Sequence, residues 1–488
     1  MLFNSLNFAF FLPLIFILYW FVANRNLKLQ NLLLLVSSYF FYAFWDWRFL
    51  FLLVFSTLLD YYSGIKISDT SKTSSKRFWF WLSISVNLCF LGVFKYYNFF
   101  VESFVDLFAG FGFTINATTL NIVLPVGISF YTFHGLSYVI DIYKKRITAE
   151  KSFVDYAVFV SFFPLLVAGP IERATHLLPQ IKNKRIFSYE KASNGLRQIL
   201  WGLFKKIVIA DTCSIFVDDI FQNYSDYSGG TLILGAVLFS FQIYCDFSGY
   251  SDIAIGVAKL LGIDLITNFK TPYFSRNIAD FWRRWHISLS SWFRDYVYIP
   301  LGGSQVSLIK SIRNIFIIFI LSGFWHGANW TFIFWGALNA LYFIPSFLMK
   351  SNRKYLSNNH SLKNDVLSKV NEFKDIFITF GLTTFAWIFF RSSSLADAIK
   401  YIKGIFKYEG FFTIQSAKTY ELSIRRLFFY IGMFLIIEWY YKNEEVIFTK
   451  FHTTKTSTVL KYLLYMFAII SIMFSIKNQA ASFIYFQF

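Results

Sequence analysis

Two histidines of this 488-residue chain stand where an ionisable side chain is costly. His326 interrupts the run 314–349, which contains no Lys, Arg, Asp or Glu. An ionisable group at membrane depth is rare and indicates a functional site by default. Imidazole exchanges protons near neutral pH, so His326 is a candidate general base. The competing interpretation is a buried histidine that only hydrogen-bonds a carbonyl.

The second histidine, His286, lies in the basic and aromatic stretch 280–296. An interfacial helix is one interpretation, because Trp, Tyr and Arg favour the headgroup level of a bilayer. The other is a clamp for the phosphates of a ligand, since cationic side chains bind phosphate and the guanidinium fork matches its geometry. The cations available for a clamp are Arg283, Arg284, Arg294 and Lys270.

Two carboxylates and an aromatic tail complete the candidates. Asp246 and Asp252 are six residues apart, which does not place them on one narrow helical face, so a catalytic pair is not expected. We expect Asp246 to orient a histidine or arginine on another helix, or to form a polar packing site. The tail 483–488 contains Tyr485 and three phenylalanines, and we expect it to be buried.

The elements that position these residues are expected to be membrane helices. The chain is 56% hydrophobic and 22% aromatic but only 15% charged, compared with about 25% charged in soluble domains. This composition excludes a soluble enzyme, a disordered chain and a disulfide scaffold. The net charge of +18 is typical of basic cytoplasmic loops and does not indicate nucleic-acid binding.

Candidate spans follow from apolar runs of about 20 residues. The uncharged run 314–349 is too long for one crossing and predicts two spans broken near 326–329. Residues 95–120 are expected to form an external amphipathic segment, 156–171 a re-entrant or broken segment, and 265–313 short interfacial helices. The candidate spans lie near 5–23, 29–45, 48–63, 78–94, 121–141, 197–221, 231–262, 311–328, 329–349, 375–391, 425–441 and 460–477.

Basic loops follow the first, third and fifth of these spans, and the positive-inside rule places such loops in the cytoplasm. The N-terminus is therefore expected outside the cytoplasm. With twelve crossings, the C-terminus and its tail also lie outside.

Three motifs together resemble the membrane-bound O-acyltransferase family, in the bacterial branch similar to alginate O-acetyltransferase. They are residues 244–252, 281–298 and 323–327, and residues 124–130 and 168–171 fit the same branch. The resemblance implies an all-α polytopic protein of about 11–13 transmembrane helices, with short re-entrant or interfacial helices, around a central funnel.

As one domain over 1–488, the chain would then consist of N-terminal helices (1–150), a catalytic core (151–350) and C-terminal helices with the tail (351–488). The resemblance also implies that His326 is the essential histidine and His286 the second site residue. A hydroxyl would attack a thioester, and the donor of the developing oxyanion's hydrogen bond would be His286, Asn329 or a backbone N–H.

The acyl donor expected from the resemblance is cytoplasmic acetyl-coenzyme A or an acyl carrier protein thioester. No bound cofactor and no metal are expected. The expected location is the bacterial inner membrane, and the expected final acceptor is a cell-envelope polysaccharide, reached with an extracytoplasmic acetyltransferase partner of the SGNH-hydrolase type. Tyr485 is hypothesised to relay the acyl group. The alternatives are a polytopic transporter or a non-catalytic component of a polysaccharide export complex.

Overall fold

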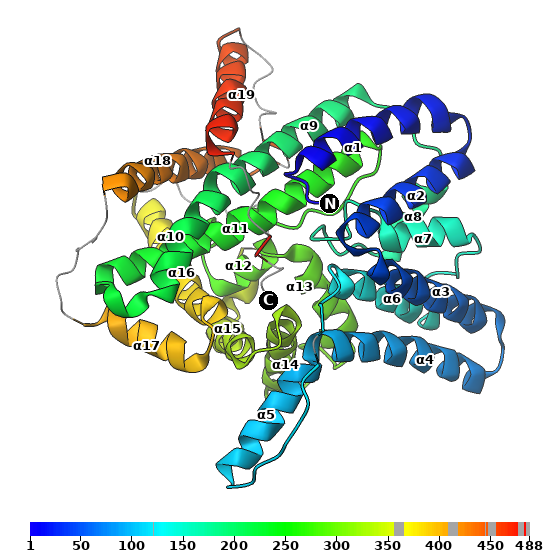
Figure 1. Cartoon of the computed structure of the whole chain (residues 1–488), viewed down its shortest axis with the longest axis horizontal. Helices are drawn as coiled ribbons and strands as arrows, with labels where there is room; N and C mark the ends of the chain where they lie inside the picture. Colours follow the sequence, from blue (N-terminus) through cyan, green and yellow to red (C-terminus); the bar gives the residue numbers. More distant parts are fainter. Residues whose placement is uncertain are drawn as a thin grey trace. The chain divides into compact units, whose positions relative to one another are not determined.

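The computed structural model describes residues 1–120, 122–355, 366–407, 418–444, 446–447, 455–476 and 483–484. Within these residues every regular element is helical and no strand occurs (Figure 1). The prediction of an all-α polytopic protein is confirmed. Tyr485 lies outside the described residues.

Nine helices of the described part are long and apolar enough to cross a bilayer, which identifies a multi-pass membrane protein. Large apolar side chains point outward from them, and Phe10 and Phe474 are each 77% exposed. Exposed apolar surface of this extent suits contact with lipid. The nine segments are Leu6–Arg25, Leu27–Asp46, Arg48–Asp69, Thr73–Gly110, Gly229–Leu260, Leu308–His326, Trp330–Leu348, Leu367–Arg391 and Thr458–Ser475.

Contacts divide the chain into two compact units. The second unit consists of Arg197–Ile253 and Thr267–Phe488, and all remaining residues form the first unit. Two long helices, α9 (Tyr189–Leu203) and α11 (Gly229–Leu260), contribute residues to both units.

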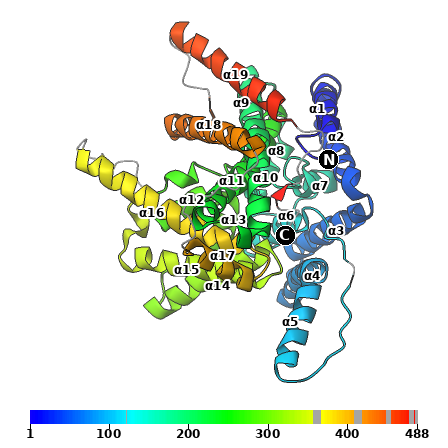
Figure 2. The same ribbon diagram turned by 60° about the vertical axis from the view of Figure 1, so that its left-hand side comes forward.

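The first unit consists of Met1–Leu196 and Ala254–Ile266. Its helices α3 and α4 lie side by side (Figures 1 and 2) and both pack against α6. Buried Asp60 of α3 accepts hydrogen bonds from Ser83 (2.6 Å) and Asn87 (2.8 Å) of α4. Its helices are α1 (Leu6–Ile17), α2 (Leu27–Asp46), α3 (Arg48–Asp69), α4 (Thr73–Leu91), α5 (Tyr97–Gly110), α6 (Ile128–Tyr143), α7 (Phe153–Ser161) and α8 (Ala174–Lys182).

Residues 254–266 belong to the first unit because they bond to its N-terminal part. The hydroxyl of Tyr19 donates to the carbonyl of Leu261 at 3.0 Å, and the indole of Trp20 donates to the carbonyl of Leu260 at 2.9 Å. These bonds satisfy carbonyls at the end of α11 that have no partner within the helix.

The segment 156–171 is broken, as predicted. Helix α7 ends at Ser161, and the irregular chain that follows is fully buried. Gly127 has a φ of +76°, and a Cβ there would collide with the carbonyl oxygen of Leu166. Only glycine allows this backbone conformation and this close approach together.

Some expected boundaries are wrong. Helix α4 does not end near residue 94 but continues through a π-helical turn into α5. At 1.5 Å per residue, Thr73–Gly110 is about 57 Å long, more than one crossing needs. The expected spans 121–141, 197–221 and 425–441 correspond to helices outside the nine. The first forms α6, which has only 16 residues, and the other two contain several charged residues each.

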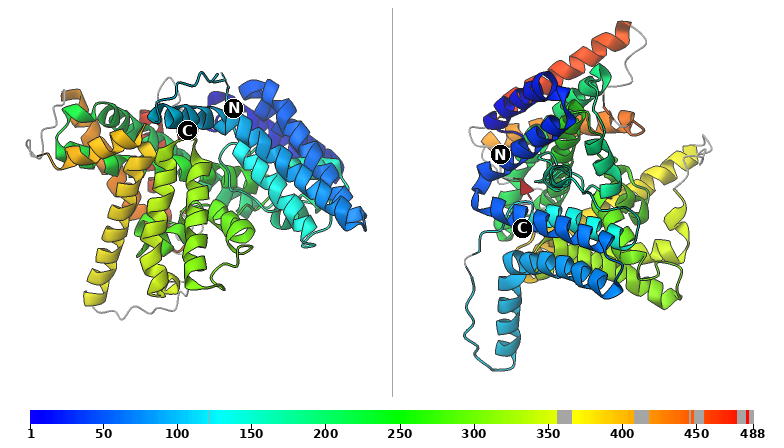
Figure 3. Two further views of the ribbon diagram at one scale, coloured as in Figure 1. Left: turned by 90° about the horizontal axis from the view of Figure 1, so that it is seen from below. Right: turned by 90° about the vertical axis from the view of Figure 1, so that its right-hand side faces the viewer.

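The second unit carries the motif residues. Helices α14, α15 and α16 stand side by side (Figure 3, left), and α14 also packs closely on α15 at Gly323 and Gly336. Besides parts of α9 and α11, its helices are the π-helix η4 (Phe204–Ala210), α10 (Asp211–Gln222), α12 (Ile278–Arg284), α13 (Ile287–Phe293), α14 (Leu308–His326), α15 (Trp330–Leu348), α16 (Val366–Arg391), α17 (Leu395–Ile405), α18 (Lys418–Tyr441) and α19 (Lys455–Ser475).

Two predictions about this unit are confirmed. The stretch 265–313 forms short helices, of which α12 and α13 have seven residues each. The uncharged run 314–349 forms two spans, because α14 ends at His326 and α15 begins at Trp330.

Candidate functional site

His286 lies at the junction of α12 and α13 with a left-handed backbone, φ 43° and ψ 54°. This conformation is costly for a residue with a Cβ and is found mainly where the surroundings enforce it. Its side chain is buried, with only 1% of the residue exposed. Nδ1 lies 3.0 Å from Oδ1 of Asn268, and Nε2 has no hydrogen-bond partner among the described residues.

Aromatic rings surround His286. Phe247 meets it edge to face with ring centres 4.6 Å apart, Phe269 stacks at 6.2 Å, and Trp325 lies at 5.7 Å. Burial among these rings lowers the pKa of His286 to about 3. His286 is therefore neutral at physiological pH.

His326, the last residue of α14, is 3% exposed. The rings of Trp335 and Phe390 each lie 5.2 Å from it, and Trp325 lies at 4.9 Å. Trp325 therefore contacts both His286 and His326. The structure brings the two sequence-predicted histidines to one aromatic cluster.

Asn329 caps the helix that follows the break. Its Oδ1 accepts the backbone N–H of Thr331 at 2.9 Å, as expected at an N-cap. Its Nδ2 donates to the carbonyl of Ser393 at 2.9 Å. Both ends of the amide thus have backbone partners.

Asp246 pairs with a lysine, not with a histidine or an arginine. Nζ of Lys206 lies 2.7 Å from Asp246 and 2.8 Å from Asp211. The neighbouring Lys205 contacts Asp252 at 2.5 Å. Both lysines are almost fully buried on η4, and buried charges persist only when they are paired.

The tail reaches this network. The backbone N–H of Ile484 donates to Oδ2 of Asp246 at 2.7 Å. Phe483 is fully buried, with ring centres 5.9 Å from Phe247 and 4.8 Å from Tyr250. The expected burial is confirmed for these two residues of the tail.

The four candidate phosphate cations have different surroundings. Arg284 bonds Asp280 at 3.0 Å. Arg283 donates to the carbonyl of Asn352 and lies 3.6 Å from the same aspartate. The exposed Arg294 bonds its neighbour Asp295 at 2.8 Å. Lys270 lines a pocket, together with Lys205 and Lys442.

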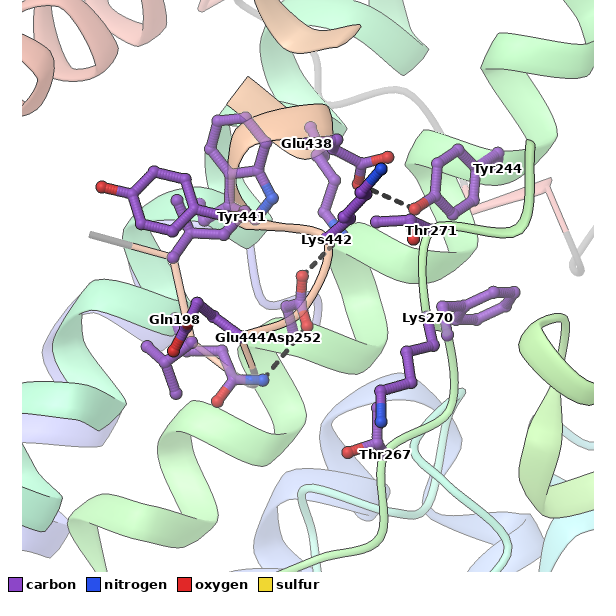
Figure 4. A pocket seen from close by; sticks show the side chains of 15 residues that line it. Gln198, Tyr244, Asp252, Thr267, Lys270, Thr271, Glu438, Tyr441, Lys442 and Glu444 are labelled. Atoms are coloured by element: carbon purple, nitrogen blue, oxygen red, sulfur yellow. Dashed lines mark hydrogen bonds and ion pairs between the residues drawn. The ribbon is translucent and has the colours of Figure 1, made fainter. Parts of the chain in front are cut away.

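That pocket, shown in Figure 4, lies between α9, α11, the loop 267–271 and the end of α18. Lys270 and Lys442 reach into it with Lys205, and three carboxylates balance them. Two of these are held: Gln198 donates to Asp252 at 3.1 Å, and Tyr244 donates to Glu438 at 2.7 Å. The third is Glu444.

The pocket is connected to His286 by one side chain. Phe269 lines the pocket and also stacks on the imidazole of His286. Its ring centre lies 5.1 Å from that of Trp285, which completes this wall. A ligand in the pocket would therefore have a single ring between itself and the buried histidine.

Sequence reasoning missed several of these residues, although signals were present. Lys205 and Lys206 are consecutive cations inside an expected span, and Glu438 is a carboxylate inside another. Intramembrane charge is the signal that could have identified them. Asn268 gave no signal, because nothing in the sequence relates it to His286.

Comparison with known proteins identifies a family to which this chain is similar. The pattern of the membrane-bound O-acyltransferase family matches residues 144–385. The probable alginate O-acetylase AlgI of Pseudomonas aeruginosa is 39% identical over 84% of this chain and 75% of its own length. The peptidoglycan O-acetyltransferase of Helicobacter pylori is 37% identical over 83% and 80%. The teichoic acid D-alanyltransferase of Bacillus subtilis is 31% identical over 48% and 62%.

Proposed function

Because the chain belongs to the membrane-bound O-acyltransferase family, we propose that it transfers an acetyl group from a cytoplasmic thioester to a cell-envelope polysaccharide. The relatives named for alginate and peptidoglycan acetylation support this acceptor class. The observation that carries the proposal is the cluster in which Trp325 contacts both His286 and His326. The chain acts in the bacterial inner membrane, with both termini outside the cytoplasm.

The pocket of Figure 4 is the proposed entrance for the thioester. Acetyl-coenzyme A and an acylated carrier protein share a phosphopantetheine arm, and Lys270 and Lys442 suit its phosphate. The arm would run toward Phe269, which separates the pocket from His286. Arg283 and Arg284 contribute less to phosphate binding, because both already pair with Asp280.

The reaction needs a base, because a hydroxyl is a weak nucleophile. His326 removes the hydroxyl proton while the oxygen attacks the thioester carbonyl carbon. The tetrahedral oxyanion then collapses, the C–S bond breaks, and protonated His326 returns the proton to the thiolate sulfur. The products are an O-acetyl ester and a free thiol, so atoms and charge balance.

The first hydroxyl to attack is proposed to be that of Tyr485. The two preceding tail residues support this, since Ile484 bonds Asp246 and Phe483 packs on Phe247, which in turn contacts His286. The acetylated tyrosine would then pass its acyl group, through an extracytoplasmic SGNH-hydrolase-type partner, to the polysaccharide.

The test is peptide mapping by mass spectrometry after incubation of the purified full-length protein with isotope-labelled acetyl-coenzyme A or labelled acetyl carrier protein. We expect label on the C-terminal peptide of the wild type and none in His326→Ala or Tyr485→Phe. His176→Ala is the matched control, since His176 bonds Glu172 in the first unit.

Three results would count against the proposal. Absence of label from both donors contradicts the acyltransferase reaction itself. Full labelling of His326→Ala contradicts the assigned base. Normal polysaccharide acetylation by Tyr485→Phe contradicts the relay alone.

A further inference from the structure

Asn268 forms hydrogen bonds to the chain around His286 through both its backbone and its side chain. Its backbone carbonyl accepts the N–H of Ile287 at 2.9 Å, and its Oδ1 faces Nδ1 of His286 at 3.0 Å. Its Nδ2 donates to Ser251 of α11 at 3.0 Å. Asn268 is itself fully buried, so these contacts define its position.

The orientation of this amide follows from an unambiguous donor. The backbone N–H of Ser288 points at Oδ1 of Asn268 at 3.3 Å, and the hydroxyl of Ser288 lies 2.9 Å from the same atom. With the amide turned over, Nδ2 would face the backbone N–H, donor against donor. The atom that faces His286 is therefore the amide oxygen.

An oxygen at that distance determines the tautomer of His286. Oδ1 accepts hydrogen bonds and cannot donate one, so Nδ1 of His286 carries the proton. The other tautomer would set two lone pairs against each other and bury an N–H at Nε2 without an acceptor among the described residues. Nε2 therefore presents a lone pair to its surroundings.

No charged group faces the imidazole among the described residues. Burial alone lowers its pKa to about 3. The nearest basic side chain along the chain, Arg284, is paired with Asp280. The ring of Trp325 contacts both His286 and His326. In the described part of the chain, the imidazole has ring or polar contacts with Phe247 of α11, Asn268 and Phe269 of the loop, Ser288 of α13 and Trp325 of α14.

We propose that Asn268 is a positioning residue that holds His286 as a neutral Nδ1–H imidazole, whose Nε2 accepts a hydrogen bond from an N–H or O–H of the bound substrate. The inference rests on the proposed acyl transfer. It excludes His286 as the hydrogen-bond donor to the oxyanion, because Nε2 carries no proton. That hydrogen belongs to the phosphopantetheine arm, which carries amides and a hydroxyl, because the attacking hydroxyl gives its own proton to His326.

The tautomer can be measured without any assay of activity. Full-length protein with 15N-labelled histidine is examined by solid-state NMR between pH 5 and 8, and the signals of His286 are identified by their loss in His286→Gln. We expect a neutral Nδ1–H imidazole throughout this range. His176, half-exposed and bonded to Glu172, is the internal reference that titrates. A protonated His286, or a proton on Nε2, overturns the inference.

The conservative variant gives a second test. Asn268→Asp keeps an oxygen toward Nδ1 but adds a negative charge, which raises the pKa of His286. Protonation removes the lone pair of Nε2, so between pH 8 and pH 5 kcat/KM of this variant should fall at least tenfold more than that of the wild type. Ser251→Ala loosens only the Nδ2 side of Asn268 and should keep the wild-type profile.

The kinetic constants of Asn268→Asp at pH 5 test this bond. A raised KM for acetyl-coenzyme A supports a hydrogen bond to the arm, and an unchanged KM overturns it. A wild-type pH profile in Asn268→Asp overturns the inference while leaving the acyl transfer intact. If the wild type transfers no acetyl group, the proposed function fails, and the NMR result still decides the tautomer.

Discussion

The backbone N–H of Ile484 donates a 2.7 Å hydrogen bond to Oδ2 of Asp246, a residue 238 positions earlier in the chain. The same carboxylate pairs with Lys206 through its other oxygen. A buried ion pair thus holds the peptide bond between Phe483 and Ile484, two residues before Tyr485. The charge network and the tail are one structural feature, although the sequence separates them widely.

The first prediction concerns the hydrogen bond between Ile484 and Asp246. Asp246→Asn should release the tail, because a hydrogen bond to a charged group contributes about 1.5–3 kcal/mol. Hydrogen exchange of the Ile484 amide should accelerate roughly ten- to hundredfold. Asp211→Asn is the matched control, since Asp211 pairs with the same Nζ of Lys206, whereas the acceptor for Ile484 is Asp246. Equal acceleration in both variants would show that the network as a whole, not the single bond, holds the tail.

The second prediction concerns the proposed base. His326→Ala should lower kcat about 10²- to 10⁴-fold, the range expected for loss of a positioned proton acceptor. His326→Gln keeps the volume and should be equally impaired, because an amide cannot take the proton. Single-turnover acetylation of the tail measures both. A Gln variant with near-normal kcat would reduce His326 to a packing residue among Trp325, Trp335 and Phe390.

The third prediction concerns the pocket. Lys270→Ala should raise KM for acetyl-coenzyme A about tenfold, or about 1.4 kcal/mol, with little change in kcat. Arg294→Ala should have a smaller effect, since Arg294 is exposed and bonded to Asp295. The difference should shrink in high salt, which screens charge. The opposite ranking would place the donor's phosphate at Arg294 rather than in the pocket of Figure 4.

The fourth prediction separates two roles of Asn329. As an N-cap, its replacement by Ala should cost about 1 kcal/mol of stability and lower the thermal midpoint. Asn329→Asp keeps the capping oxygen but loses the Nδ2 donor, which bonds Ser393 in the wild type. We expect kcat of this variant to fall less than tenfold. A loss of 10²-fold or more would assign the oxyanion contact to Asn329.

Composition and charge spacing predicted the fold class and the break at His326. The uncharged run 314–349 is too long for one membrane crossing, so it had to form two helices with a turn between them. They also predicted the short helices around His286, where Pro272, Pro300 and dense charge forbid a span. Apolar runs did not predict α6 correctly, since its residues are buried by protein and not by lipid.

The partners of the site residues could not be predicted, because they come from distant segments. Asp246 and Ile484 meet only in the folded chain, and so do Lys205 and Asp252. Asn268 is an ordinary loop residue until the left-handed turn at His286 brings the imidazole to it. Local spacing identifies a helical face, but it carries no information about which segment packs against that face.

The first unit includes residues 254–266, to which Tyr19 and Trp20 bond. Within the first unit, these residues are synthesised last, after α9 and most of α11 have been made. Tyr19 and Trp20 therefore cannot form these hydrogen bonds until more than half of the chain has been synthesised. Truncation before residue 254 should leave an N-terminal fragment that is captured by quality-control proteases, whereas truncation after residue 266 should leave this unit complete.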